Sequence, residues 1–293
     1  MYYRRKVLLA LIEKSKEKKI GKLNLQKMLF LFCRKQHKPS YDFIPYNYGC
    51  YSFQANKDLL LMSQFYNLIG ENETEWILKT NDSYINELNS YDSQNISNLF
   101  KTEDIDNQSK FISSIYKRYP YYAINSKRNL NSNEQKLINH EKQKVKSQNN
   151  MQLFTIGYEG KNIDQYLDDL IRNNITVLCD VRRNPKSMKY GFSKKQIQRY
   201  CNNLSIKYVH LPELGIESSQ RKNLSDKESY RKLFDLYKIR LNSKAEEIKH
   251  IYDLLEENKR IALTCFESDP LSCHRHIIAN KINKEFNIPI NHI

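Results

Sequence analysis

The sequence predicts an α/β protein in two parts: a mainly helical, winged-helix-like domain, followed by a Rossmann-like domain with a parallel β-sheet. Residues 1–125 carry apolar side chains at helical spacing, whereas from residue 151 onward short apolar strands alternate with amphipathic helices. Residues 126–150 are polar and rich in lysine, which is typical of a linker. The predicted boundaries are therefore 1–125 for the helical domain, 126–150 for the linker and 151–293 for the α/β domain.

The composition excludes a disordered or fibrous chain and favours an anionic partner. The 293 residues are 40% hydrophobic and include only 7 Gly and 7 Pro. With 48 Lys+Arg and 33 Asp+Glu, the formal net charge is 48 − 33 = +15. Cationic side chains that neutralise phosphates release counterions, so the charge favours nucleic acid, DNA more than RNA, or a nucleotide as partner. The alternative is that an Asn- and Lys-rich composition reflects an AT-rich genome.

The apolar runs and the cysteines predict a cytoplasmic protein without a membrane span. The apolar run Val7–Ile12 has six residues, far fewer than the roughly 20 that a membrane helix needs. The cysteines are scattered and form no Cys-x-x-Cys pair, so neither a disulfide framework nor a zinc ribbon is predicted. They are Cys33, Cys50, Cys179, Cys201, Cys265 and Cys273. The sequence predicts no cofactor and identifies no protein partner.

The elements of the first part follow the order of a winged helix. Apolar residues recur at helical spacing in residues 7–12, 25–32 and 59–69, and residues 75–80 form a plausible strand after the turn at Gly70. The stretches 23–30, 48–52 and 68–69 together are similar to the SocA/Panacea-like antitoxin domains. This resemblance covers about 70 residues.

A mixed basic and aromatic segment follows, with two interpretations. The basic side chains Lys117, Arg118, Lys127 and Arg128 flank the aromatic cluster 119–122. Such a mixture suits base stacking and phosphate contacts. The alternative is that these aromatic rings belong to the core.

The second part predicts five strands and the helices between them. The strands are expected at 153–156, 176–179, 207–211, 261–266 and 288–293, and the helices at 162–173, 193–203, 227–257 and 276–285. This alternation indicates a parallel sheet covered by helices on both faces. Ligands bind such sheets at the carboxyl ends of the strands.

Polar and reactive side chains follow the first four predicted strands. They are Tyr158 after the first, Asp180, Arg182 and Arg183 after the second, Glu213 after the third, and Cys265, Glu267, Cys273, His274 and Arg275 at and after the fourth. A purely structural domain has little reason to keep this composition on four strand ends. The convergence therefore predicts a functional crevice.

The arginines and carboxylates have two possible uses. Arg182, Arg183 and Arg275 suit bidentate binding of phosphate, helped by a helix that begins near Ser272. The alternative is that these arginines pair with Asp180 or Glu267. Either carboxylate could act as general base, while Asp180 could instead cap the following loop.

The cysteines at the predicted crevice are either reactive or structural. Cys265 could serve as a nucleophile, but the next arginine, Arg275, is ten residues away, which does not fit the phosphate-binding loop of tyrosine phosphatases. Cys265, Cys273, His274 and His276 do not have a recognised zinc spacing, so no metal is predicted.

The same residues carry a second family resemblance. Four blocks look like the signatures of domain-of-unknown-function family 488: 155–158, 180–185, 208–215 with Tyr208 and His210, and 265–275. The match spans about 140 residues. It implies a Rossmann-like α/β fold and little about activity.

Together these features predict an enzyme that acts on nucleic acid or a nucleotide. The expected reaction is hydrolysis of an N-glycosidic bond, as in a DNA glycosylase, or of a phosphodiester bond. In the first case Tyr158 would stack on a flipped base. A role on modified DNA in bacterial defence is an expectation by analogy. The alternatives are a non-catalytic nucleotide-sensing DNA-binding regulator and a Cys-dependent transferase.

Overall fold

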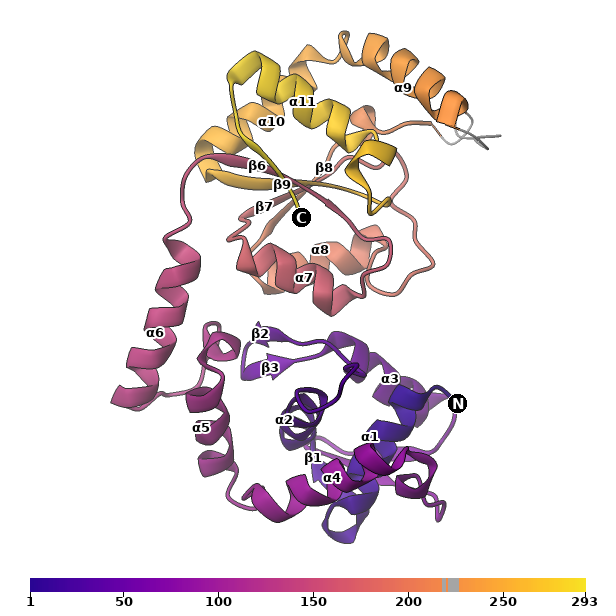
Figure 1. The fold of residues 1–293 in the computed structure, drawn as a ribbon, viewed down its shortest axis with the longest axis vertical. Helices are drawn as coiled ribbons and strands as arrows, with labels where there is room; N and C mark the ends of the chain where they lie inside the picture. Colours follow the sequence, from indigo (N-terminus) through magenta and orange to yellow (C-terminus); the bar gives the residue numbers. More distant parts are fainter. Residues whose placement is uncertain (218–219, 221–226) are drawn as a thin grey trace. The chain divides into compact units, whose positions relative to one another are not determined.

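The computed structural model describes residues 1–217, 220 and 227–293, which form two compact units. The first unit is Met1–Lys144 and the second is Val145–Ile293. Figure 1 traces the chain through both, from the indigo helices of the first unit to the yellow C-terminal helix of the second. In the described part of the chain, no helix has the length and apolar character required to cross a bilayer.

The first unit has the element order of a winged helix. Its helices are α1 (Tyr3–Lys14), α2 (Lys22–Cys33) and α3 (Phe53–Gln64). Its antiparallel sheet has the order β1 (Lys19–Gly21), β5 (Glu75–Leu78), β4 (Ile69–Glu71). A hairpin of β2 (Ile44–Tyr46) and β3 (Gly49–Tyr51) lies between α2 and α3. The predicted helix at 59–69 begins earlier, at Phe53, because the Ser52 side chain caps it by accepting a hydrogen bond from the Ala55 N–H.

The core of the first unit is built on α1 and α2. All six residues of Val7–Ile12 are buried, and so is every residue of 25–33. The rings of Tyr119 and Tyr122 pack edge-on against Phe30, with centroids 5.0 and 4.7 Å away. These two rings of the aromatic cluster therefore belong to the core, while its basic neighbours lie outside it.

Three more helices complete the first unit: α4 (Ser90–Thr102), α5 (Gln108–Arg118) and α6 (Ser132–Lys146). Helix α6 occupies most of the segment interpreted as a linker. It begins with a capping box, in which Asn131 and Glu134 exchange side-chain-to-backbone hydrogen bonds of 3.0 and 3.1 Å.

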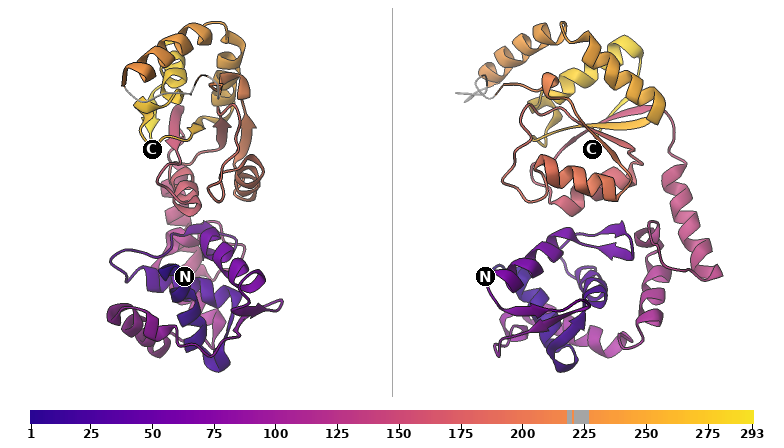
Figure 2. Two further views of the ribbon diagram at one scale, coloured as in Figure 1. Left: turned by 90° about the vertical axis from the view of Figure 1, so that its right-hand side faces the viewer. Right: turned by 180° about the vertical axis from the view of Figure 1, so that it is seen from behind.

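The second unit contains a five-stranded parallel sheet covered on both faces, as the sequence predicts. The strand order is β10 (Ile290–His292), β6 (Gln152–Gly157), β9 (Arg260–Cys265), β7 (Val177–Asp180), β8 (Lys207–His210). Helices α7 (Ile163–Arg172) and α8 (Lys194–Asn203) cover one face. Helices α9 (Lys227–Leu241), α10 (Ala245–Asn258) and α11 (Arg275–Phe286) cover the other, as Figures 1 and 2 show. The single helix expected at 227–257 is thus two helices.

The central position of β9 brings the strand ends together. All six residues of β9 are buried, since it pairs with β6 on one side and β7 on the other. Cys265 lies opposite Gly157, and Asp180 lies opposite Thr264 and His210. The loops after β6, β7, β8 and β9 therefore leave the sheet at one edge.

Candidate functional site

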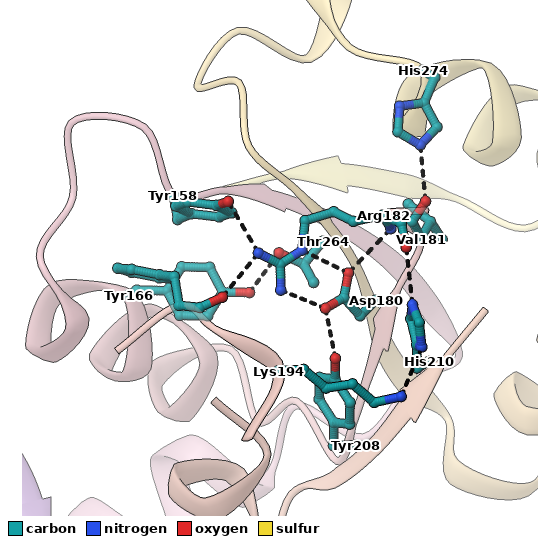
Figure 3. A network of polar contacts seen from close by, with 11 residues as sticks. Tyr158, Tyr166, Asp180, Val181, Arg182, Lys194, Tyr208, His210, Thr264 and His274 are labelled. Atoms are coloured by element: carbon teal, nitrogen blue, oxygen red, sulfur yellow. Dashed lines mark hydrogen bonds and ion pairs between the residues drawn. The ribbon is translucent and has the colours of Figure 1, made fainter. Parts of the chain in front are cut away.

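A buried ion pair occupies the centre of this edge (Figure 3). Asp180 is fully buried, and Arg182 is 6% exposed. The Arg182 Nε and Nη2 donate to the two oxygens of Asp180 over 2.8 and 2.5 Å, and the Arg182 backbone N–H donates to the same carboxylate over 3.1 Å. The alternative in which Arg182 pairs with Asp180 is therefore the one that the structure contains.

Aromatic hydroxyls complete the pair. Tyr208 donates to Asp180 over 2.6 Å, and Arg182 Nη1 donates to the Tyr158 hydroxyl and to the Phe192 carbonyl over 3.0 and 2.9 Å. Burial raises the pKa of Tyr208, and the neighbouring Asp180 carboxylate raises it further. Burial alone would lower the pKa of Arg182, but Asp180 more than offsets this, so the guanidinium stays charged.

Two histidines contact backbone carbonyls of the segment that carries this ion pair. His274 Nε2 lies 3.0 Å from the Val181 carbonyl, and His210 Nε2 lies 2.9 Å from the Arg182 carbonyl. Since a carbonyl oxygen only accepts, both Nε2 atoms carry the proton. His210 Nδ1 then accepts from the Lys194 ammonium over 2.9 Å.

Arg183 points to the loop after β8. It contacts Glu213 and Glu217 over 2.6 and 2.8 Å, and a third of its side chain is exposed. The Arg183 guanidinium lowers the pKa of Glu213. The two loops touch directly, because a Cβ added to Gly215 would lie 2.1 Å from the Arg183 backbone nitrogen.

Arg275 binds the backbone of the loop after β9. It is 1% exposed, and its two terminal nitrogens donate to the carbonyls of Glu267 and Ser268 over 2.5 and 3.0 Å. A Cβ on Gly157 would lie 1.8 Å from the same Glu267 carbonyl. Arg275 and the close approach of Gly157 therefore fix the backbone at Glu267, whose side chain is half-buried.

Tyr158 lies deeper than its predicted stacking role requires. It is 4% exposed, and its ring stacks on Phe192 at a centroid distance of 4.4 Å. Exposed apolar side chains of the loops at this edge include Phe266, which is 42% exposed and meets Tyr158 edge-on, and Met188, which is fully exposed in the loop after β7. Neither residue stood out in the sequence, because single apolar residues in loops are common.

Cys265, Cys273 and His274 form a buried cluster behind the ion pair. His274 Nδ1 lies 3.8 Å from the Cys265 sulfur and 3.9 Å from the Cys273 sulfur. Burial raises the pKa of the Cys273 thiol. A buried thiol with a raised pKa is a poor nucleophile, which argues against covalent chemistry there. The three side chains have the donor types of a metal site. The sequence spacing did not indicate this, since Cys265 ends a strand while Cys273 and His274 precede a helix.

His276 does not join the cluster. Its Nδ1 lies 2.6 Å from the Cys273 carbonyl, and its ring packs edge-on against Phe234.

The first unit has its own cavity, of about 330 Å³. It is lined by aromatic residues that include Tyr46, Tyr48 and Trp76, and by Lys27. Lys27 is 1% exposed and donates to the Cys50 carbonyl over 2.8 Å. Burial lowers the pKa of Lys27.

One comparison with known proteins identifies part of the chain. The family model described as Domain of unknown function DUF488 matches residues 162–282, which confirms the resemblance drawn for the second part. A search of curated proteins finds no match. The resemblance of the first part to SocA/Panacea-like domains stays a prediction.

Proposed function

We propose that this chain, whose second unit contains a DUF488 domain, is an enzyme that acts on nucleic acid or a nucleotide and hydrolyses an N-glycosidic or a phosphodiester bond. The observation that carries the proposal is the convergence of carboxylate, guanidinium, imidazole and phenol groups from four strand ends on one edge of a parallel sheet. In open α/β sheets this edge is where ligands bind. Clusters of groups with shifted pKa values mark functional sites more often than other surfaces.

Glu267 is the proposed general base. Both oxygens of Asp180 already accept hydrogen bonds from Arg182, and one also accepts from Tyr208, so Asp180 serves to position the Arg182 loop. The Glu267 backbone is held by Arg275, which fixes the point at the strand end from which the Glu267 side chain extends. A carboxylate at this position can take a proton from the attacking water.

The loop after β7 suits contact with a duplex. Met188 is fully exposed between Lys186 and Lys189. Proteins that open a duplex insert apolar side chains such as Met between bases, with cations on the phosphates beside them. Phe266, which is 42% exposed, offers a ring face for a base that leaves the stack.

The first unit offers a separate contact for the phosphate backbone. A hollow of about 420 Å³ is lined entirely by polar side chains: Ser109, Lys110, Ser113, Ser114, Lys117, Arg128 and Asn131. Hydroxyl and cationic groups are the usual partners of phosphate oxygens. The wing hairpin β4–β5 carries Glu71, Glu73 and Glu75 instead, so it would repel phosphates.

The test is incubation of the purified protein with labelled DNA and RNA, both ordinary and base-modified. In DNA, strand breaks that appear only after alkali indicate a glycosylase. Direct breaks indicate a nuclease, and RNA is scored only for these because alkali itself cleaves RNA. Glu267→Gln is expected to lower the rate by about 10²- to 10⁴-fold. The matched control is Glu246→Gln, an exposed residue of α10, which should leave the rate unchanged. Equal cleavage rates for Glu267→Gln and Glu246→Gln would show that Glu267 is not the general base.

Met188→Ala tests the duplex contact separately. It should slow cleavage of duplex substrate about tenfold or more and leave single-stranded substrate unaffected, because only the duplex has to be opened. The readout is the ratio of the two rates. An equal loss on both substrates would mean that Met188 does not act as a wedge.

The second candidate function is a non-catalytic, nucleotide-sensing DNA-binding regulator. It is favoured by the fact that Asp180, one of the two carboxylates expected to activate water, is fully buried and already bound by Arg182 and Tyr208. It predicts a salt-sensitive gel shift without turnover on any substrate. Lys117→Glu should then weaken DNA binding and reduce the slope of log affinity against log salt concentration by the amount of about one phosphate contact. Lys16 is exposed and lies outside the hollow, so Lys16→Glu should change neither quantity.

A further inference from the structure

Three soft donor atoms meet in the interior of the second unit. The sulfurs of Cys265 and Cys273 and Nδ1 of His274 all lie within 4.8 Å of one another. The three residues are at most 1% exposed. They come from two elements, because Cys265 ends β9 while Cys273 and His274 immediately precede α11.

The distances are close to those that a tetrahedral ion imposes. With Zn–S bonds of about 2.3 Å and Zn–N bonds of about 2.0 Å, tetrahedral angles place a sulfur and a nitrogen about 3.5 Å apart. The two measured sulfur-to-Nδ1 distances are 3.8 and 3.9 Å. Movements of a few tenths of an ångström would therefore bring each sulfur to the tetrahedral distance from Nδ1, and the two sulfurs lie within 4.8 Å of each other.

The tautomer of His274 is also the one that a metal ligand requires. Its Nε2 faces the Val181 carbonyl at 3.0 Å and so carries the proton, which leaves the Nδ1 lone pair directed at the sulfurs. A backbone carbonyl that orients a histidine in this way is the usual support of a metal-binding imidazole.

The donor set selects the kind of ion. Two thiolates and an imidazole are soft or borderline ligands, which Zn²⁺ prefers and Mg²⁺ or Ca²⁺ does not. Two thiolates also cancel the charge of a divalent ion, so the complete site is neutral in the apolar interior.

We propose that Cys265, Cys273 and His274 bind one Zn²⁺ ion. Three protein ligands leave a fourth coordination position for water or a substrate atom, as in catalytic zinc sites. Glu267 lies two residues after Cys265, which ends β9, so this position belongs to the same strand ends as the candidate site. Zn²⁺ binding at these residues is independent of which bond the protein cleaves.

The test uses the full chain, from which bound metal has been removed with a chelator. Its cysteines are kept reduced with a phosphine in place of a thiol reductant. Titration with Co²⁺ as the probe should give one equivalent per chain and the near-ultraviolet absorption of a cobalt–thiolate bond, which Zn²⁺ then displaces. X-ray absorption of the Zn²⁺ form should show two sulfur neighbours. Cys265→Ser, Cys273→Ser and His274→Gln should each lower the Zn²⁺ affinity at least 100-fold, while Cys201→Ala, a buried cysteine of α8, should bind normally.

A second measurement separates loss of binding from loss of folding. Zn²⁺ should raise the melting temperature of the wild type and of Cys201→Ala, but not that of the three ligand variants that retain native circular dichroism. Folded wild type without the cobalt–thiolate band, or Zn²⁺ binding unchanged by Cys265→Ser together with Cys273→Ser, would overturn the proposal. A Cys265–Cys273 disulfide that persists after treatment with the phosphine would do the same.

Discussion

Asp180 and Arg182 lie two residues apart, so at the end of a strand their side chains point in the same direction and meet. The pair is buried, and removal of the carboxylate would leave the Arg182 charge without compensation. Asp180→Asn is therefore expected to lower the free energy of unfolding by about 3–5 kcal/mol. The measurement is urea denaturation, with Asp253→Asn as control, because Asp253 forms an exposed pair with Lys249 on α10. A change as small as that of the control would contradict the structural role of the Asp180–Arg182 pair.

The sequence placed the right residue types at this edge but could not assign their partners. Which arginine meets which carboxylate depends on side-chain directions after the strands end. The Asp180-x-Arg182 spacing was a usable signal, since period-two spacing puts both on one side. Arg275 gave no such signal, because it binds the backbone carbonyls of residues 267 and 268. Every residue has a backbone carbonyl, so the sequence cannot show which ones an arginine will bind.

At the scale of elements, the loop after β9 is positioned by contact with the end of β6. A Cβ at residue 157 would lie 1.8 Å from the Glu267 carbonyl oxygen, a backbone atom that cannot move alone. Gly157→Ala is expected to cost about 3 kcal/mol of stability and to displace Glu267. Urea denaturation measures the first effect and the cleavage assay the second.

Gly70→Ala is the matched control for this substitution. A Cβ at residue 70, in β4, would approach only the flexible end of the Lys79 side chain. If Gly157→Ala were as stable and as active as Gly70→Ala, the tight contact between the two loops would not exist in solution.

The elements themselves were more predictable than their arrangement. Alternating apolar strands and amphipathic helices indicated the parallel sheet of the second unit, and this was confirmed. The position of β9 between β6 and β7 was not predictable, since it depends on which crossover each helix makes. The break between α9 and α10, at residues 242–244, contains no Gly or Pro. Its signals were weaker ones that the prediction of a single helix missed: Asn242 directly after the basic last turn of α9, and Ser243 three residues before Glu246.

At the scale of the whole molecule, buried thiols predict how stability responds to alkali. Burial raises the pKa of Cys33, Cys179 and Cys201 from 9.0 to about 12. Above pH 9 the unfolded chain loses these protons while the folded chain keeps them, so stability present below pH 9 is lost as the pH rises toward 12. Each thiol should remove about 1 kcal/mol for each pH unit in this window.

The difference in unfolding free energy between the wild type and Cys201→Ala isolates the contribution of one thiol. Urea denaturation at pH 7, 9 and 10.5 should show a stability deficit of the variant at pH 7, from lost packing, that shrinks between pH 9 and 10.5. Tyrosines and lysines that titrate in the same window affect both proteins equally. A deficit that stays constant with pH would show that Cys201 ionises equally in both states.

The place of β9 in the sheet also governs how the second unit can assemble during synthesis. β6 and β7 are not neighbours, and the strand that joins them emerges from the ribosome about 80 residues after β7. Until then each has an unpaired edge, and such edges recruit other chains. The sheet of the second unit therefore cannot join β6 to β7 until residue 265 has been synthesised, and until then the edges of these apolar strands stay unpaired. The first unit, whose sheet closes within its own first 78 residues, can fold well before that point.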